Sequence, residues 1–290
     1  MGVGWRVDSD GPLDWPAYLE MAGDKYGRKG KKRYATVIQL HDKVQEGDLC
    51  WTRDLEGNYY LGVVESDWFY DASEASRQYD MVNLRRCRWS PKMSVDQVPG
   101  KVVNSFVGRR PTLQSIKEPS AVAYSFALAN QATVLGTDYP VSLTSARLLD
   151  LISFDDCEDL VGIYLQSKGY FLVPSSCKKS TVGYEYLLQH RETGKTAVAQ
   201  VKKGKVDLNQ THFEPARLAV DRVFLFTTEG QYLGEPHAGV VCLSPDTLIE
   251  FAQAHPDWMP YRIRFWMDRL SQPSEAGSPQ PSALEVETAS

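Results

Sequence analysis

The sequence predicts an α+β protein of several domains, with a small β-barrel at the N-terminus and an α/β sheet in the C-terminal half. Residues 43–90 hold short, aromatic-rich strand patterns separated by glycine turns, as in small closed barrels. From residue 146 onward, helical patterns alternate with apolar strands, which is typical of a sheet with helices on its faces. We expect a barrel at 1–90, a connector at 91–145, the α/β domain at 146–270 and a disordered tail at 271–290.

The composition is that of a soluble globular protein. Of the 290 residues, 42% are hydrophobic and 24% are charged, and the net charge of −5 excludes an overall basic surface. The five cysteines are dispersed and form no CxxC pair, which favours reduced thiols and a cytoplasmic location. The sequence contains neither a membrane-spanning apolar stretch nor a signal-peptide pattern, so we expect no membrane association.

The elements of the C-terminal half follow from apolar periodicity and capping residues. Ser153 is a suitable N-cap for a helix over 154–168, and Ser244 followed by Pro245 begins another helix. Short apolar runs between them predict strands. In order, we expect a helix at 154–168, strands at 170–174, 184–190 and 196–202, a helix at 209–218, strands at 222–227 and 239–243, and helices at 245–254 and 260–270.

Residues 184–204, YEYLLQHRETGKTAVAQVKKG, predict a hairpin that gathers polar side chains. With a two-residue Thr-Gly loop, Glu185 would lie opposite Lys202, and Gln200 opposite Leu187. Side chains alternate along a strand and cross-strand partners share a face, so Gln200 and Lys202 would lie on the same face as Glu185. A one-residue slip in register would separate them.

This hairpin resembles the catalytic hairpin of the PD-(D/E)xK restriction-endonuclease-like superfamily, and more closely its Mrr-like branch, in which Gln-x-Lys forms the second half of the motif. The matching residues are Glu185, Gln200 and Lys202, and Glu158 matches an acidic position in the family's first helix. Two departures are visible. The family usually has Asp, preceded by Pro, at the position of Glu185, and most members have a carboxylate at the position of Gln200.

The resemblance implies a metal-dependent nuclease. It implies that Glu185 and Glu158, with the carbonyl of Val201, hold Mg²⁺ or Mn²⁺, and that Lys202 orients the water and the phosphate. Glu158, Glu185, Gln200 and Lys202 are therefore the candidate catalytic residues. Two simpler interpretations remain open: the hairpin carries an ordinary Glu–Lys surface pair, and Glu158 only complements the positive end of its helix.

Basic residues are candidates for contact with phosphate. Such contacts position a nucleic acid without reading its bases, although most charged runs are simply solvated loops. The candidates near the hairpin are Lys178, Lys179, Lys203 and Lys205, and those elsewhere are Lys29, Lys31, Lys32, Arg33, Arg109 and Arg110.

The N-terminal segment GDLCWTRDLEGNYYLGVV resembles the opening of SH3-like reader barrels of the Tudor and PWWP type, with PUA-like or EVE-like barrels as a second interpretation. Most of its aromatic residues are expected to fill the barrel core. Some could instead form a pocket for a cation or for a base turned out of a duplex. The candidates for this reader pocket are Trp51, Tyr60, Trp68, Phe69 and Tyr70.

These features predict a metal-dependent DNA endonuclease of restriction or anti-phage defence, in which the N-terminal barrel selects the target. The expected partner is DNA, modified or foreign, and a homodimer or a complex with a second defence subunit is compatible with the sequence. Two other classes remain: a catalytically inactive nucleic-acid-binding module of the same fold, and an adaptor that recognises a protein through its barrel.

Overall fold

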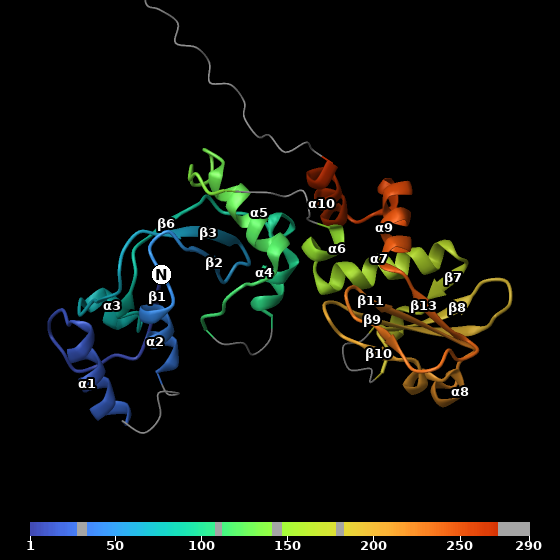
Figure 1. The fold of residues 1–290 in the computed structure, drawn as a ribbon, viewed down its shortest axis with the longest axis horizontal. Coiled ribbons are helices and arrows are strands. Elements are labelled where there is room, and N and C mark those ends of the chain that lie inside the picture. The colour runs from blue at the N-terminus through green and yellow to red at the C-terminus, as the bar shows by residue number, and fades with distance from the viewer. Residues whose placement is uncertain (28–33, 108–111, 141–146, 178–182, 272–290) are drawn as a thin grey trace, which may run out of the picture.

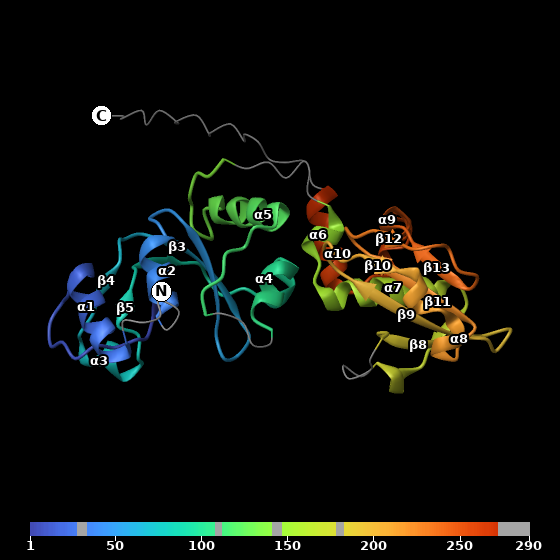
Figure 2. The same ribbon diagram turned by 60° about the horizontal axis from the view of Figure 1, so that its bottom comes forward.

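The computed structural model describes residues 1–27, 34–107, 112–140, 147–177 and 183–271. The chain forms an N-terminal lobe and a C-terminal lobe, and α4 (Gly100–Ser105) and α5 (Pro119–Asn130) lie between them (Figures 1 and 2). Ser271 ends the last described helix, and the rest of the predicted tail lies outside the described residues. No described helix has the length and apolar character needed to cross a bilayer.

The C-terminal lobe is built on a five-stranded sheet with the order β13-β11-β9-β8-β7. Strands β9, β11 and β13 are parallel, and β7 and β8 continue the sheet in antiparallel fashion. Their bounds are β7 Tyr170–Leu172, β8 Tyr186–His190, β9 Thr196–Lys202, β11 Arg222–Thr227 and β13 Val240–Leu243. The α/β sheet expected from the sequence is therefore present, with β9 at its centre.

Apolar residues of β9 are divided between the two faces of the sheet. Ala197, Ala199 and Val201 belong to the main core, together with residues of α7 (Phe154–Ser167). Val198 belongs to a smaller cluster on the other face. Alternation along the strand therefore places Gln200 and Lys202 on the face opposite to α7.

Further short elements complete the C-terminal lobe. The predicted helix 209–218 is two short helices, and Ser244 caps α9 as expected, because its side chain accepts from Asp246. The bounds are α6 Leu148–Leu151, η2 Pro174–Ser176, β10 Leu208–Asn209, η3 Gln210–Phe213, α8 Pro215–Leu218, β12 Tyr232–Leu233, α9 Pro245–Ala254, η4 Pro256–Trp258 and α10 Tyr261–Ser271.

The N-terminal lobe is not the closed barrel that the sequence predicts; its described residues form two separate three-stranded antiparallel sheets. One sheet has the order β1-β5-β4 and the other the order β2-β3-β6. The bounds are β1 Gly2–Val3, α1 Trp15–Tyr26, α2 Ala35–Asp42, β2 Leu49–Arg53, β3 Tyr59–Val64, β4 Phe69–Tyr70, α3 Glu74–Gln78, β5 Asn83–Leu84 and β6 Cys87–Trp89.

The sequence of residues 81–89 alternates as one strand, and Arg85 explains why the structure divides it into β5 and β6. Arg85 lies between β5 and β6, where the chain passes from one sheet to the other, and only 5% of it is exposed. Its guanidinium donates to the carbonyls of Leu40 (2.8 Å) and His41 (2.9 Å) at the end of α2, and to the carbonyl of Ser66 (2.9 Å). Bonds to the last carbonyls of a helix stabilise its end, and here they anchor the crossover as well.

The predicted connector packs against both lobes. It contains η1 (Val95–Gln97), α4 (Gly100–Ser105) and α5 (Pro119–Asn130). The indole of Trp51 in β2 donates to Ser125 of α5 (3.0 Å), and the main core includes Leu61 of β3 as well as Trp266 of α10. This core therefore contains residues from both sides of the predicted boundary at residue 90. The predicted domain bounds stay predictions.

Gly100 of α4 packs against the backbone of Ile152 and Ser153, and its replacement should destabilise the protein. A Cβ at this position would overlap the backbone of Ile152. We expect Gly100→Ala to lower the free energy of unfolding by about 1–3 kcal/mol, because one backbone has to move away from the other. Urea or thermal unfolding measures this. Gly11→Ala is the control, because a Cβ at Gly11 meets nothing within 4 Å, and equal stability of the two variants would contradict the contact.

Candidate functional site

The hairpin that carries the candidate residues has a longer turn than the sequence suggests. The amide of His190 donates to the carbonyl of Lys195 (2.8 Å), which leaves residues 191–194 as a four-residue turn. Gly194 has φ +70°, a conformation that glycine adopts without steric cost. The predicted two-residue Thr-Gly loop is wrong.

The longer turn moves the register by two residues without changing which side chains share a face. Tyr186 pairs with Ala199, so Glu185, one residue earlier, lies beside Gln200 rather than opposite Lys202. Side-chain direction has a period of two, so a two-residue shift keeps all three side chains on the predicted face. The observed pairs are Tyr186–Ala199, Leu187–Val198, Leu188–Ala197 and Gln189–Thr196.

Glu185, Gln200 and Lys202 form one hydrogen-bonded group. The amide Nε2 of Gln200 donates to Oε1 of Glu185 (2.7 Å), and Nζ of Lys202 donates to the same oxygen (3.0 Å). Gln200 is only 6% exposed, whereas the side chains of Glu185 and Lys202 are 24% and 36% exposed. Among the described residues, none donates to Oε2 of Glu185.

Glu158 approaches this group from α7, on the other face of the sheet. The hydroxyl of Tyr186 donates to the backbone carbonyl of Glu158 (3.2 Å) and so fastens the helix to β8. Burial raises the pKa of the Glu158 carboxyl to about 7, and the negative charge of Glu185 adds to this effect, while Lys202 opposes it. Glu158 therefore lies within electrostatic range of the hairpin group.

A divalent cation bound at the hairpin would have few protein ligands and would keep most of its water. No cluster of three or more His, Cys, Asp or Glu side chains suited to a metal occurs in the described part of the chain. Mg²⁺ is often bound by only one or two carboxylates; Glu185 supplies one on the hairpin face, and a second ligand role for Glu158, which comes from α7 on the other face, stays a prediction. The part of the Val201 carbonyl stays a prediction; the Val201 side chain is buried on the α7 face.

Lys203 is not placed for the phosphate contact predicted from the sequence. Its ammonium donates to the backbone carbonyls of Asp150 (3.1 Å) and Ile152, at the end of α6, and burial lowers its pKa. Its neighbour Lys202 points to the opposite face, so two adjacent lysines have different environments. Lys205 is exposed, and its contact with phosphate stays a prediction. The other basic candidates lie outside the described residues: Lys29, Lys31, Lys32, Arg33, Arg109, Arg110, Lys178 and Lys179.

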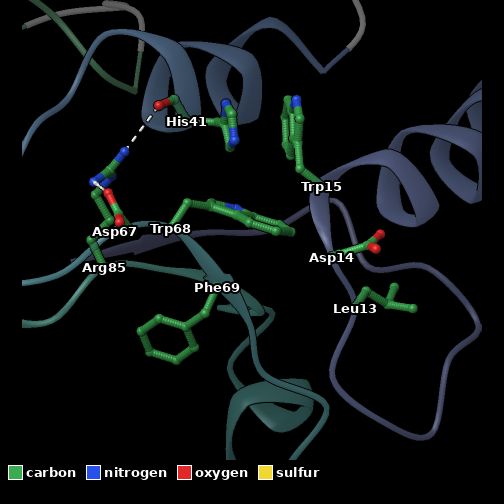
Figure 3. Close-up of a pocket in the computed structure, with 8 residues that line it drawn as sticks. All are labelled: Leu13, Asp14, Trp15, His41, Asp67, Trp68, Phe69 and Arg85. Atoms are coloured by element: carbon green, nitrogen blue, oxygen red, sulfur yellow. Dashed lines mark hydrogen bonds and ion pairs between the residues drawn. The ribbon is translucent and has the colours of Figure 1, made fainter.

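Two of the five reader-pocket candidates line a recess of about 430 Å³ in the N-terminal lobe (Figure 3). These are Trp68 and Phe69. The other three lie elsewhere: Trp51 bonds to Ser125 of α5, Tyr60 bonds to Asp54 (3.0 Å), and Tyr70 is buried and bonds to the carbonyl of Val7 (3.0 Å). The remaining lining residues are Leu13, Asp14, Trp15, His41, Asp67 and Arg85, which no sequence spacing connects.

Comparison with known proteins gives little further information. No family model matches the chain, and no curated protein matches it. Among solved structures, the "DNA modification-dependent restriction endonuclease AspBHI" aligns with 77% of this chain and 68% of its own chain, at 12% identity and a TM-score of 0.24. That TM-score is too low to indicate a shared fold, so the function has to be inferred from the site itself.

The raised pKa of Glu158 predicts a pH-dependent effect on stability. Between its unfolded pKa of 4.5 and its folded pKa of about 7, the unfolded chain loses the Glu158 proton first, so this residue destabilises the fold as pH rises. In chelator, we expect Glu158→Gln to melt at a higher temperature than wild type at pH 8 and at the same temperature near pH 4.5. The control Glu192→Gln, in the exposed turn, should change neither melt. If the melting temperatures of Glu158→Gln and wild type differed by the same amount at both pH values, the raised pKa of Glu158 would be contradicted.

Proposed function

We propose that this chain is a metal-dependent endonuclease that hydrolyses DNA phosphodiester bonds. The observation that carries the proposal is the convergence on Glu185 Oε1 of an amide and an ammonium. A plain surface ion pair needs only Lys202 and Glu185. A nearly buried Gln200 that donates to the same carboxylate is more than such a pair requires, and this supports a built site.

Each residue has a distinct part in the proposed reaction. Gln200 fixes the orientation of the Glu185 carboxylate, and Lys202, the more exposed donor, steadies the scissile phosphate and the attacking water. Glu185 and Glu158, with the carbonyl of Val201, would hold Mg²⁺ or Mn²⁺, which supplies charge neutralisation on the phosphate oxygens and lowers the pKa of a bound water. Restriction or anti-phage defence, with the target selected by the N-terminal lobe, is the role we propose.

A second candidate function is a DNA-binding module of the same fold that does not cut. Gln200 favours it, because a neutral amide at a position where many nucleases have a carboxylate lowers the charge available to hold a metal. The same amide ties up Oε1 of Glu185. Cleavage in the presence of metal distinguishes the two candidates, and salt-sensitive binding distinguishes the module from a protein adaptor.

Lys202→Ala should abolish cutting and leave the fold intact. The change removes a cation directed at the phosphate, and such donors are typically worth about 3 kcal/mol, roughly a hundredfold in rate. Plasmid cleavage with Mg²⁺ or Mn²⁺ and with chelator measures it, and Glu185→Ala should behave in the same way. Lys195→Ala, at an exposed residue directly after the turn of the same hairpin, is the matched control. Wild-type protein that binds DNA but never cuts it would leave the binding module as the function.

Gln200→Glu should make the hairpin depend on metal. The new carboxylate would lie where Nε2 now donates to Glu185 at 2.7 Å, so two negative charges would face each other. We expect the metal-free variant to lose about 1–3 kcal/mol of stability, to recover it in Mg²⁺, and to keep or raise cleavage activity. Melting with and without chelator tests this. Gln189→Glu, exposed on β8, is the control, and a Gln200→Glu melt that is indifferent to metal would show that the site holds none.

A further inference from the structure

The recess in the N-terminal lobe has aromatic walls that the proposed nuclease chemistry does not use. The rings of Trp15 and His41 are stacked, with centroids 3.8 Å apart and planes within 6°. The indole of Trp68 crosses that of Trp15 at 74°, with a centroid distance of 5.0 Å. Figure 3 shows the stacked pair on one side of Trp68 and Phe69 on the other. The recess therefore presents flat apolar surfaces in two orientations.

The Trp68 wall is held in place by hydrogen bonds to a buried residue. The indole of Trp68 donates to Oδ1 of Asn83 (3.3 Å), and Asn83 is completely buried. The amide of Asn83 donates in turn to the carbonyl of Gly4 and to the hydroxyl of Tyr18 (3.3 Å). A recess whose lining is fixed before binding loses little conformational entropy when a ligand enters.

Polar groups lie at opposite ends of the recess (Figure 3). At one end, Arg85 donates to three backbone carbonyls and lies 3.7 Å from Asp67, whose side chain is fully exposed. At the other end, Asp14 caps α1 by accepting from the amide of Ala17 (2.9 Å). A guanidinium has five N–H donors, and both carboxylates have lone pairs beyond those already used. The ends of the recess therefore offer both donors and acceptors.

The chemistry of the lining discriminates between two kinds of ligand. Aromatic walls suit either a methylated ammonium or a flat heterocycle. A cation would have to enter beside the buried positive charge of Arg85, while Asp67 is already paired with that arginine and Asp14 with a helix end. A neutral, planar ring with donors and acceptors on its edge is not repelled by the charge of Arg85. The volume of about 430 Å³ also falls in the range of small-molecule sites.

We propose that this recess binds a single nucleobase turned out of the DNA duplex, stacked on Trp68 and bonded at its edge by Asp67 and Arg85. The inference rests on the proposed function only in taking DNA as the partner. It gives the N-terminal lobe a physical means of choosing a target, because a base that is mismatched or otherwise poorly paired costs less to extrude.

The test is equilibrium binding of two DNA duplexes to full-length protein. The cleavage-deficient Lys202→Ala chain, in chelator, is titrated against fluorescent duplexes that are identical except for one mismatched pair. We expect at least tenfold tighter binding of the mismatched duplex, and we expect Trp68→Ala in this background to remove the difference. Trp258→Ala, at an exposed indole of the C-terminal lobe, is the control and should leave the difference unchanged. A 2-aminopurine at the mismatch should change its emission only when Trp68 is present.

A second variant keeps the inference testable if the Trp68→Ala protein does not fold. Asp67→Ala alters a fully exposed side chain, and we expect it to reduce the preference several-fold without changing the melting temperature. Equal affinity for both duplexes, or a preference that survives both variants, would overturn the inference. So would Trp68-dependent binding of a trimethyllysine peptide in place of DNA. DNA cleavage by the wild-type protein is measured separately. A protein that never cuts DNA but binds the mismatched duplex more tightly through Trp68 would refute the proposed nuclease activity and support base binding in the recess.

Discussion

The geometry of the candidate site depends on one oxygen atom, Oε1 of Glu185, which accepts from both Gln200 and Lys202. Glu185 comes directly before β8, so these two bonds close the end of the hairpin away from its turn. They also fix the register, because a slip of one residue would carry Glu185 to the other face of the sheet. A neutral amide and a cation hold the carboxylate in place, so the assembly of this group does not depend on a metal.

The C-terminal fold could be predicted because its local signals agree with its tertiary structure. β9 and β11 match the predicted runs at both ends, since apolar stretches bounded by polar residues define buried central strands. Ser153 caps α7 as expected, through its bond from the amide of Asp156. The sequence predicts that the site residues share a face even though it does not predict the register. Side chains alternate between the two faces along a strand, and the observed register differs from the predicted one by two residues, so each side chain stays on its predicted face.

Other features depend on contacts that no local pattern reveals. The four-residue turn is set by the His190–Lys195 bond, and the sequence equally allows the shorter loop. Lys203 has the same chemistry as Lys202, and only its contact with the end of α6 makes it structural. In the N-terminal lobe, the buried bonds of Arg85 to α2 divide an apparently continuous strand. The recess combines Trp15, His41 and Trp68 from three separated segments, so it exists only in the folded chain.

The backbone of Ile152 links several of these features. Its carbonyl accepts from Lys203, the residue after Lys202, and Gly100 of α4 packs directly on the same peptide. The N-terminal portion of the chain therefore meets the C-terminal lobe through an interface that has no room for a side chain at Gly100. Anyone who replaces the N-terminal lobe to make a chimeric protein would have to keep α4 and its glycine together with the C-terminal sheet. A junction made upstream of α4 would preserve that fit, whereas one made between α4 and α6 would replace it with a clash or a gap.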